Sequence, residues 1–342
     1  GAWRKRTQNT SWYNEALNTS TRGATKKFPS VAVIVAESNK VTIYDGDDPS
    51  MPMWMVFLLT SNYVWAHTAG GNITSVSMMQ GVLAIGTSGE NYTWSGAHIE
   101  YFLSDWGGIA STATNPRSYS SIANRHQVAD GAYQTYINVG IIVDSKVNDV
   151  AMTVLPNAPI GADTGLPVPT IAVATDGGVS VIKDDGSVVD ITNSNASFLV
   201  CDSITLNSNG RLSYVNSYSG GGVGWVYVFN SVPSADNVIT INTKTGSTQN
   251  AVALYDARSS SATLPYIDLV LVGPQDDVDA STESSFGSVS GVTLLDENTT
   301  TPTNGAVAYV TSDYNTGWMV GDIKLATLSD TDTTTPASTN LV

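Results

Sequence analysis

The residues that most often perform catalysis or bind transition metals are few in this chain. It has three histidines, His67, His98 and His126, and one cysteine, Cys201. Their spacing matches neither a helical H-E-x-x-H motif nor the paired ligands of a zinc finger. Cys201 lies in an alternating apolar run, where a small buried side chain is expected. The pattern therefore does not favour a zinc site, and we expect Cys201 in the core.

Carboxylates are abundant, and two of them a few ångströms apart could hydrolyse a glycosidic bond. A sialidase-type site would also need clustered arginines to bind a substrate carboxylate, whereas Arg117, Arg125, Arg211 and Arg258 are widely separated. The segment from Ser104 to Gly107 only partly matches the Ser-x-Asp-x-Gly-x-Thr-Trp box of glycoside-cleaving propellers, and it does not repeat. The motifs of a nucleophile elbow and a P-loop are also absent from the sequence. We therefore predict that the chain is not an enzyme.

Two acidic clusters could hold calcium, which prefers several oxygen ligands on a flexible turn. The first cluster is Asp45, Asp47 and Asp48, where Gly46 permits a bend, and the second is formed by residues 276, 277 and 279. Neither cluster has the spacing of an EF-hand loop. A turn with solvated carboxylates is the alternative, and calcium is the only cofactor that the sequence suggests.

Aromatic side chains in polar stretches could form a platform for sugars or proteins. Their neighbours are rich in Gly, Ser and Asn, which is typical of recognition loops. The candidates for ligand binding are Tyr92, Trp94, Trp106, Tyr119 and Tyr133. The alternative is that some of them cover strand edges, as we expect Trp54, Trp225 and Trp318 to belong to the core.

Charge is distributed unevenly along the chain, which has a net charge of −15. Residues 1–27 hold six of the 15 basic residues but only one of the 30 acidic ones, which leaves 9 basic and 29 acidic residues for the rest. An acidic body repels phosphate backbones, so no nucleic-acid partner is expected. The basic segment could instead dock on an acidic neighbour or an identical subunit, through the candidate residues Arg4, Lys5, Arg6, Lys26 and Lys27.

Beyond residue 30 the sequence alternates between β-branched or apolar residues and turn residues, which is typical of hairpins. The seven clearest turns are Ser38-Asn39, Gln80-Gly81, Asp130-Gly131, Asp176-Gly177-Gly178, Ser208-Asn209-Gly210, Ser259-Ser260 and Thr303-Asn304. They recur every 30 to 50 residues, roughly the length of one four-stranded propeller blade. The sequence therefore predicts an all-β chain.

We interpret residues 31–329 as a β-propeller of seven blades, with six or eight as alternatives. A tandem β-sandwich or jelly roll is the alternative architecture, because it would also give many short strands. Residues 1–30 lack a clean period and are expected to form a basic arm or linker. Residues 330–342, rich in Thr, Asp and Ser, are expected to form a linker to a missing C-terminal domain.

Four segments resemble recurring sequences in predicted structural proteins of marine bacteriophages, of tail or tail-fibre type. They are residues 3–57, 171–192, 266–279 and 317–332. The resemblance implies a virion or extracellular location and supplies no catalytic residue.

Three functions follow as hypotheses. The first is a non-catalytic structural module of a phage tail or fibre that serves as a spacer or hub and takes part in host attachment, with other virion proteins or identical subunits as partners. The second is a receptor-recognition module that binds host surface glycans. The third is a polysaccharide-cleaving enzyme. No membrane insertion is expected, because the longest apolar run, residues 51–59, is far shorter than the roughly 20 residues that cross a bilayer.

Overall fold

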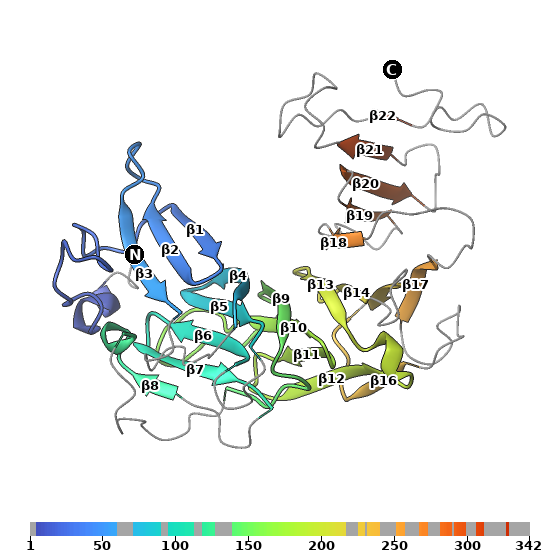
Figure 1. Cartoon of the computed structure of the whole chain (residues 1–342), viewed down its shortest axis with the longest axis horizontal. Helices are drawn as coiled ribbons and strands as arrows, with labels where there is room; N and C mark the ends of the chain where they lie inside the picture. The colour runs from blue at the N-terminus through green and yellow to red at the C-terminus, as the bar shows by residue number, and fades with distance from the viewer. Residues whose placement is uncertain are drawn as a thin grey trace. The chain divides into compact units, whose positions relative to one another are not determined.

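The computed structural model describes residues 5–59, 71–89, 95–112, 118–126, 139–216 and 231–239, the strand at 225–229, and the backbone of the strands beyond residue 250 (Figure 1). This part of the chain is all-β. Its helical residues are Lys5 and Arg6, which are α-helical, and three single turns of 3-10 helix, η1 (Thr7–Asn9), η2 (Ile122–Asn124) and η3 (Ala196–Phe198). Among the described residues, no helix has the length and apolar character needed to cross a bilayer.

Three sheets belong to a first compact unit, residues 1–194 with 233–239. The first sheet has the order β1 (Ala32–Glu37), β2 (Lys40–Asp45), β3 (Met53–Leu58). The second has the order β4 (Ile73–Met79), β5 (Val82–Thr87), β6 (Ala97–Tyr101), β7 (Trp106–Ala110), β8 (Ser118–Ser120). The third has the order β9 (Val147–Thr153), β10 (Thr170–Thr175), β11 (Gly178–Ile182), β12 (Val188–Asn193), followed by β16 (Asn237–Ile239), which pairs in parallel with β12.

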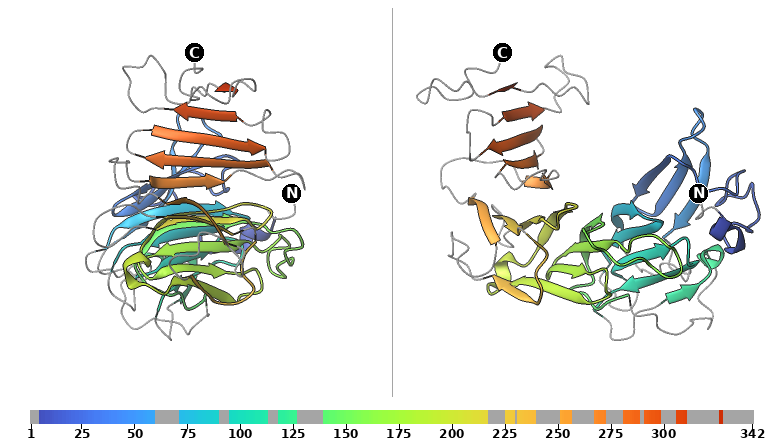
Figure 2. Two further views of the ribbon diagram at one scale, coloured as in Figure 1. Left: turned by 90° about the vertical axis from the view of Figure 1, so that its right-hand side faces the viewer. Right: turned by 180° about the vertical axis from the view of Figure 1, so that it is seen from behind.

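Two further sheets belong to a second unit, residues 195–232 with 240–342. One has the order β13 (Cys201–Leu206), β14 (Leu212–Asn216), β15 (Trp225–Phe229), β17 (Ala251–Asp256). The other has the order β18 (Ile267–Val272), β19 (Ser281–Ser288), β20 (Gly291–Asn298), β21 (Ala306–Val310), β22 (Ala326–Thr327), and Figure 2 shows its strands as a ladder in chain order.

The strand order within the sheets confirms the predicted all-β, propeller-type fold class. Consecutive strands pair as antiparallel neighbours in every sheet, which is the meander of a propeller blade, and β16 is the parallel exception. A jelly roll would instead require Greek-key order within its sheets, whereas the order within each described sheet follows the chain except at β16. The number of blades stays a prediction. Residues 330–342 lie outside the described residues.

Tight turns create the meanders, and four of the seven predicted turns are present in the described chain. They join β1 to β2, β4 to β5, β10 to β11 and β13 to β14. At the second of these, Gln80 and Gly81 have φ angles of 52° and 77°, as a two-residue hairpin turn requires. The predicted turns at 130–131, 259–260 and 303–304 lie outside the described residues.

The sheet of β4 to β8 is packed on both faces. Leu83 and Ile85 of β5 point into a core shared with β1 to β3, whereas Val82 and Ala84 point into a core shared with β9 to β12. Every residue of β5 is consequently buried. A sheet buried on both sides is typical of stacked blades, because one blade cannot cover its own faces. The core predictions are confirmed for Trp54 and Cys201, which are 0% and 2% exposed, while the side chains of Trp225 and Trp318 lie outside the description.

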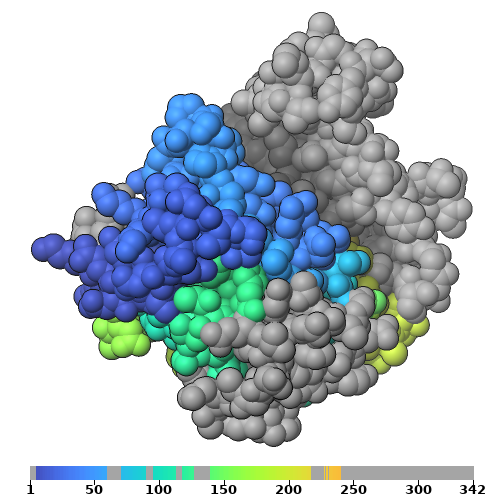
Figure 3. All heavy atoms as spheres, turned by 60° about the vertical axis from the view of Figure 1, so that its left-hand side comes forward, coloured from blue at the N-terminus to red at the C-terminus, as the bar shows by residue number. Residues whose placement is uncertain are grey.

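The N-terminal segment differs from the predicted basic arm or linker, because residues 5–30 are folded onto the first unit. In Figure 3 the dark blue atoms of this segment lie directly on lighter blue and green atoms of that unit. Trp12 is fully buried, and its indole Nε1 donates to the carbonyl oxygen of Phe102 at 2.7 Å. Its ring meets that of Trp54 edge to face at a centroid distance of 5.5 Å. Burial of such a large aromatic surface fixes the segment despite its lack of a regular period.

Residues 21–23 add a further short pairing to the free edge of β3. The Val56 amide donates to the Thr21 carbonyl at 2.9 Å, and the Gly23 amide donates to the Trp54 carbonyl at 2.9 Å. A Cβ atom at Gly23 would overlap the carbonyl oxygen of Met53, so the close approach of the two backbones requires glycine. The first sheet thereby gains an outer partner, which covers an edge that would otherwise be open to pairing with other chains.

A buried ion cluster, here named the Glu15 clasp, holds this pairing in place. It consists of Glu15, Arg22 and Arg125, and both arginine side chains are 0% exposed. Arg125 donates to both carboxylate oxygens of Glu15 at 3.0 Å, and Arg22 Nε lies 3.7 Å from Oε2. Arg125 also donates to the carbonyls of Val56 and Thr21 at 2.8 and 3.1 Å. One guanidinium therefore binds both partners of the added pairing.

Arg22 lies over the ring of Trp54, with its Cζ 4.2 Å from the ring centroid, and donates from Nη1 to the Trp54 carbonyl at 2.7 Å. Burial lowers the pKa of Arg22 to about 10, an effect that the charge of Glu15 opposes and that of Arg125 increases. Arg22 therefore remains charged at neutral pH, and the clasp depends on Glu15 as its anion.

Replacing Glu15 by Gln should leave two buried guanidinium groups without an anion. We expect Glu15→Gln to lower the free energy of unfolding by about 3–5 kcal/mol, the usual result of removing one partner from a buried ion pair. Urea unfolding followed by tryptophan fluorescence measures this loss. The matched control is Glu37→Gln, which removes the solvent-exposed pair of Glu37 with Lys40 and should change stability little. Equal effects of the two substitutions would contradict a structural role for the clasp.

Candidate functional site

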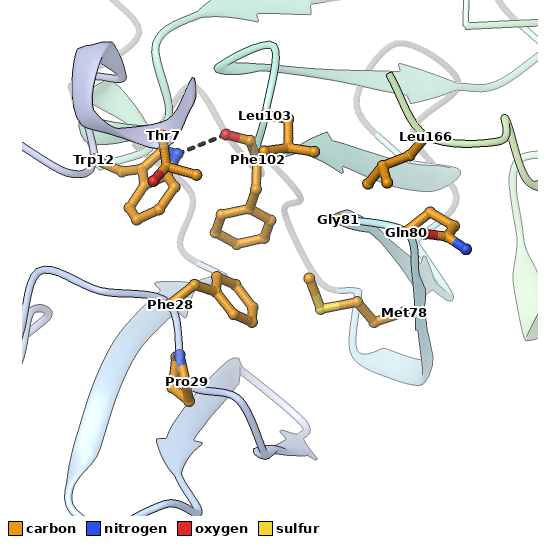
Figure 4. A pocket seen from close by; sticks show the side chains of 10 residues that line it. All are labelled: Thr7, Trp12, Phe28, Pro29, Met78, Gln80, Gly81, Phe102, Leu103 and Leu166. Atoms are coloured by element: carbon orange, nitrogen blue, oxygen red, sulfur yellow. Dashed lines mark hydrogen bonds between the residues drawn. The ribbon is translucent and has the colours of Figure 1, made fainter. Parts of the chain in front are cut away.

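An apolar pocket, here named the Trp12 pocket, lies where the N-terminal segment meets the ends of two hairpins (Figure 4). Its volume is about 270 Å³. Five segments of the first unit line the pocket. They are Thr7 with Trp12, Phe28 with Pro29, the end of β4 and the β4–β5 turn (Met78, Gln80 and Gly81), the β6–β7 turn (Phe102 and Leu103), and Leu166. The figure shows the rings of Trp12, Phe28 and Phe102 and the thioether of Met78 converging on one space. The arrangement suits an apolar group.

A second pocket, here named the lysine pocket, has a volume of about 440 Å³. Phe28 and Pro29 line both pockets, so the chain at these residues separates one from the other. The lysine pocket is otherwise lined by Tyr13, Thr25, Lys26, Lys27, Ser30, Asp45 and Asp47. Lys26 Nζ lies 5.6 Å from the centroid of the Tyr13 ring, within the range of a cation–π contact. This pocket therefore carries both signs of charge.

The candidate docking residues are placed on both sides of these pockets. Lys5, Arg6, Lys26 and Lys27 are all exposed, and none of them forms an ion pair within the described part of the chain. Arg6 donates from Nη1 to the backbone carbonyl of Asp163 at 3.1 Å, which places it beside the loop that contains Leu166. Arg4 lies outside the described residues. These four residues therefore give the N-terminal segment an exposed basic surface, and the segment that carries it is folded onto the first unit.

The candidate calcium ligands Asp45, Asp47 and Asp48 accept hydrogen bonds from the loop backbone. Asp47 accepts the amides of Ser30 and Val31 at 2.6 and 3.1 Å, and Asp45 accepts the amide of Asp47 at 3.1 Å. Asp48 accepts the Ser50 amide and hydroxyl, and these hydrogen bonds lower the pKa of Asp48. Within the described residues, no group of three His, Cys, Asp or Glu side chains is placed to hold a metal ion. The acidic cluster at 276–279 lies outside them.

Two of the five candidate ligand-binding aromatics are described, and they lie on opposite faces of one sheet. Trp106 on β7 is half-buried and stacks on Tyr101 of β6 at a centroid distance of 4.2 Å. Tyr119 on β8 is 7% exposed and points into the other core. The two aromatics therefore do not form a common platform, and Tyr119 is a core residue. Tyr92, Trp94 and Tyr133 lie outside the described residues.

Tyr119 reaches across β7 to a buried carboxylate. Gly107 of β7 lies directly opposite Glu100 of β6 on one side and Tyr119 of β8 on the other. The Tyr119 hydroxyl passes over Gly107 and donates to Glu100 Oε2. A Cβ atom at Gly107 would lie 2.7 Å from the tyrosine oxygen, so only glycine leaves room for this bond. Burial, and then the charge of Glu100, raise the pKa of Tyr119 well above its ordinary value.

A tyrosine beside a carboxylate could act as a nucleophile with its base, because sialidases use a tyrosine nucleophile. Glu100 is however 0% exposed, and the raised pKa keeps the Tyr119 hydroxyl protonated. The pair thus satisfies two buried polar groups, and its chemistry in this structure is that of a hydrogen bond within the core.

His126 also serves the fold. Its Nε2 accepts the Leu58 amide at 2.9 Å, which requires the neutral imidazole. Burial, and then the charge of Arg125, lower the pKa of His126 from 6.5 to about 3. The histidine is therefore uncharged over the physiological range, and it caps the end of β3.

Sequence reasoning missed the residues that build the Trp12 pocket. The sequence predicts an arm or linker at Trp12 and Phe28, because residues 1–30 show neither the periodicity of a helix nor that of a strand. The available signal was the presence of large aromatic residues in that segment, since a solvated linker rarely contains them. Their partners Phe102 and Trp54 are distant in sequence, so only the structure reveals the cluster.

Comparisons with known proteins give structural similarity alone. No family model matches the sequence, and no curated protein matches it. Among solved structures, the complex of BBS1N with ARL6DN is 10% identical, with a TM-score of 0.36 over 88% of this chain and 76% of that chain. Phage phi92 endosialidase is 10% identical, with a TM-score of 0.34 over 83% of this chain and 52% of that chain.

The β-propeller domain of Vanderwaltozyma polyspora Nup133 is 11% identical, with a TM-score of 0.34 over 80% of this chain and 70% of that chain. This chain thus matches about half the length of the endosialidase. We base the fold class on the strand order of the chain itself, and its function on its own residues.

The depressed pKa of His126 predicts a loss of stability in mild acid. Below pH 6.5 the unfolded chain binds a proton that the folded chain excludes down to about pH 3, so stability falls as the pH drops through this window. We expect a loss of about 2 kcal/mol between pH 7 and pH 5 from this group. Urea midpoints at the two pH values measure it.

The control for this prediction is His126→Gln, which keeps an acceptor near the Leu58 amide and does not titrate. Its stability should depend much less on pH over the same interval. If the variant and the natural chain lost equal stability, the acid sensitivity would belong to other groups.

Proposed function

We propose that this chain is a non-catalytic structural module of a phage tail or fibre, which serves as a spacer or hub and takes part in host attachment. The observation that supports this proposal is that the acid–base groups of the first unit bind one another or the backbone. Glu100, Tyr119, Arg22 and Arg125 are buried, Glu15 and His126 are partly buried, and all of them are bound to one another or to the backbone. They stabilise the fold, as a rigid mechanical module requires.

The build of the first unit supports this role. The middle sheet is packed on both faces, and the N-terminal segment extends the first sheet at its outer edge. Such packing favours a stiff body that transmits force between neighbours. Charged residues form only 13% of the sequence, so its surface is mostly polar and uncharged, as in many secreted and virion proteins.

The proposed partners are other virion proteins or identical subunits, and the proposed location is the virion or the extracellular space. Lys5, Arg6, Lys26 and Lys27 form an exposed basic surface on a chain that is otherwise acidic. Opposite charge on a partner would steer association and fix its orientation. Glycan recognition and polysaccharide cleavage remain the competing functions, and the following test separates them.

Antibodies raised against the purified chain should label the tails of the phage particles that carry it, as seen by immunogold electron microscopy. Gold confined to other parts of the particle, or absent from it, would contradict the proposal. Binding to a glycan array that saturates with concentration would instead support the receptor-recognition function.

Enzyme activity is tested separately with Glu100→Gln, because this substitution keeps an oxygen acceptor for Tyr119 but removes the carboxylate. We expect equal, background release of reducing sugars from host polysaccharides by both proteins. Release that the substitution abolishes would establish a polysaccharide-cleaving enzyme.

A further inference from the structure

We infer that the Trp12 pocket is a docking site for an acidic peptide segment that inserts one large apolar side chain. The inference rests on the proposed function as an interaction module, and it specifies the chemistry of a partner. Two independent features point to this occupant, namely the apolar lining of the pocket and the positive charge on its two sides, which forms no ion pair within the described residues.

The pocket has the build of a site for an apolar anchor. Trp12 and Phe102 are buried, whereas Phe28, Met78, Leu103 and Leu166 are half-buried and border the opening. At about 270 Å³ the pocket lies just below the usual range of small-molecule sites, about 300–1,000 Å³, and therefore suits a single side chain. Partly exposed aromatic and methionine side chains around a buried floor are typical of the centre of a protein interface.

The charges beside the pocket specify an acidic partner. Arg6 precedes Thr7 of the lining, and Lys26 and Lys27 precede Phe28 on the other side. The only acidic residue of the first 27 is Glu15, which is bound by the arginines of the clasp. The positive charge of Arg6, Lys26 and Lys27 is therefore not neutralised by an ion pair within the described residues, and a carboxylate-rich segment would supply the missing charge.

The carboxylates nearest to these lysines do not change this conclusion. Asp47 is in the lysine pocket, but both of its oxygens accept backbone amides. Asp45 accepts an amide as well. The acidic groups thus hold the loop, while the lysine side chains are exposed. Nucleic acid is the less suitable polyanion, because the rest of the chain carries 29 acidic residues and would repel it.

The test uses the full chain and a fluorescein-labelled peptide with one central phenylalanine flanked by glutamates. We expect saturable binding by fluorescence anisotropy, weakened at least about tenfold when alanine replaces the phenylalanine, because the apolar anchor is lost. A peptide with lysines in place of the glutamates should not bind. This peptide series needs no change in the protein, so it tests the site even if a variant fails to fold.

Two variants locate the binding on the molecule. Lys26→Glu should weaken binding about fivefold through reversal of one charge beside the pocket. Its matched control is Lys40→Glu, which makes the same charge change at the opposite end of the β1–β2 hairpin and should leave binding unchanged. Leu166→Trp should fill the pocket and weaken binding about tenfold or more, with its fold checked by circular dichroism.

Three results would overturn the inference. The first is equal binding of the phenylalanine and alanine peptides, which would mean that charge alone is recognised. The second is no peptide binding by a chain that still labels phage tails, which would leave the proposed function intact. The third is self-association that Lys26→Glu suppresses, which would assign the pocket to a second copy. Peptide binding without tail labelling would contradict the proposed function and support the docking site.

Discussion

The first unit depends on one carboxylate, that of Glu15, which is bound between two buried guanidinium groups. Glu15 comes from an irregular segment, Arg22 from the residues that pair with β3, and Arg125 from the turn after η2. Arg125 binds the carbonyls of Val56 and Thr21 as well as Glu15, so it joins a sheet edge to the strand that covers it. Such a cluster stabilises only when all its members are present. It therefore fixes the N-terminal segment together with the buried indole of Trp12.

The pocket follows from that constraint. With residues 21–23 fixed on β3, the chain brings Trp12 and Phe28 against Trp54 and Phe102. The Trp12 pocket is the space that these rings leave beside the β4–β5 and β6–β7 turns. The Trp12 pocket on the surface thus depends on the charges of the Glu15 clasp. The polar groups whose chemistry is best suited to catalysis, such as Glu100 and Tyr119, stabilise the fold.

The sequence predicts well what is local. Turn residues and alternation predict the hairpins at 38–39, 80–81, 176–177 and 208–210, because both signals act between neighbouring residues. Burial of Trp54 and Cys201 follows from the same alternation. The N-terminal segment was mispredicted because it is irregular, and its contacts with Phe102 and Arg125 join residues about a hundred positions apart. The sequence also does not predict the burial of Tyr119. Its partner Glu100 lies two strands away in the sheet, and their side chains meet over Gly107 of the strand between them. The sequence also does not reveal that the carboxylate of Asp47 accepts the amides of Ser30 and Val31, which lie 17 and 16 positions away along the chain.

Residues 21–23 are a hydrogen-bonded part of the first sheet, and hydrogen exchange of the Gly23 and Val56 amides measures this pairing. These two N–H groups donate across the added pairing at 2.9 Å. We expect both amides to exchange at least about a thousandfold more slowly than in an unstructured peptide, which corresponds to local opening at about 4 kcal/mol. Exchange of both amides at the unstructured rate would show that residues 21–23 are not paired with β3 and that residues 1–30 are the arm that the sequence alone suggests.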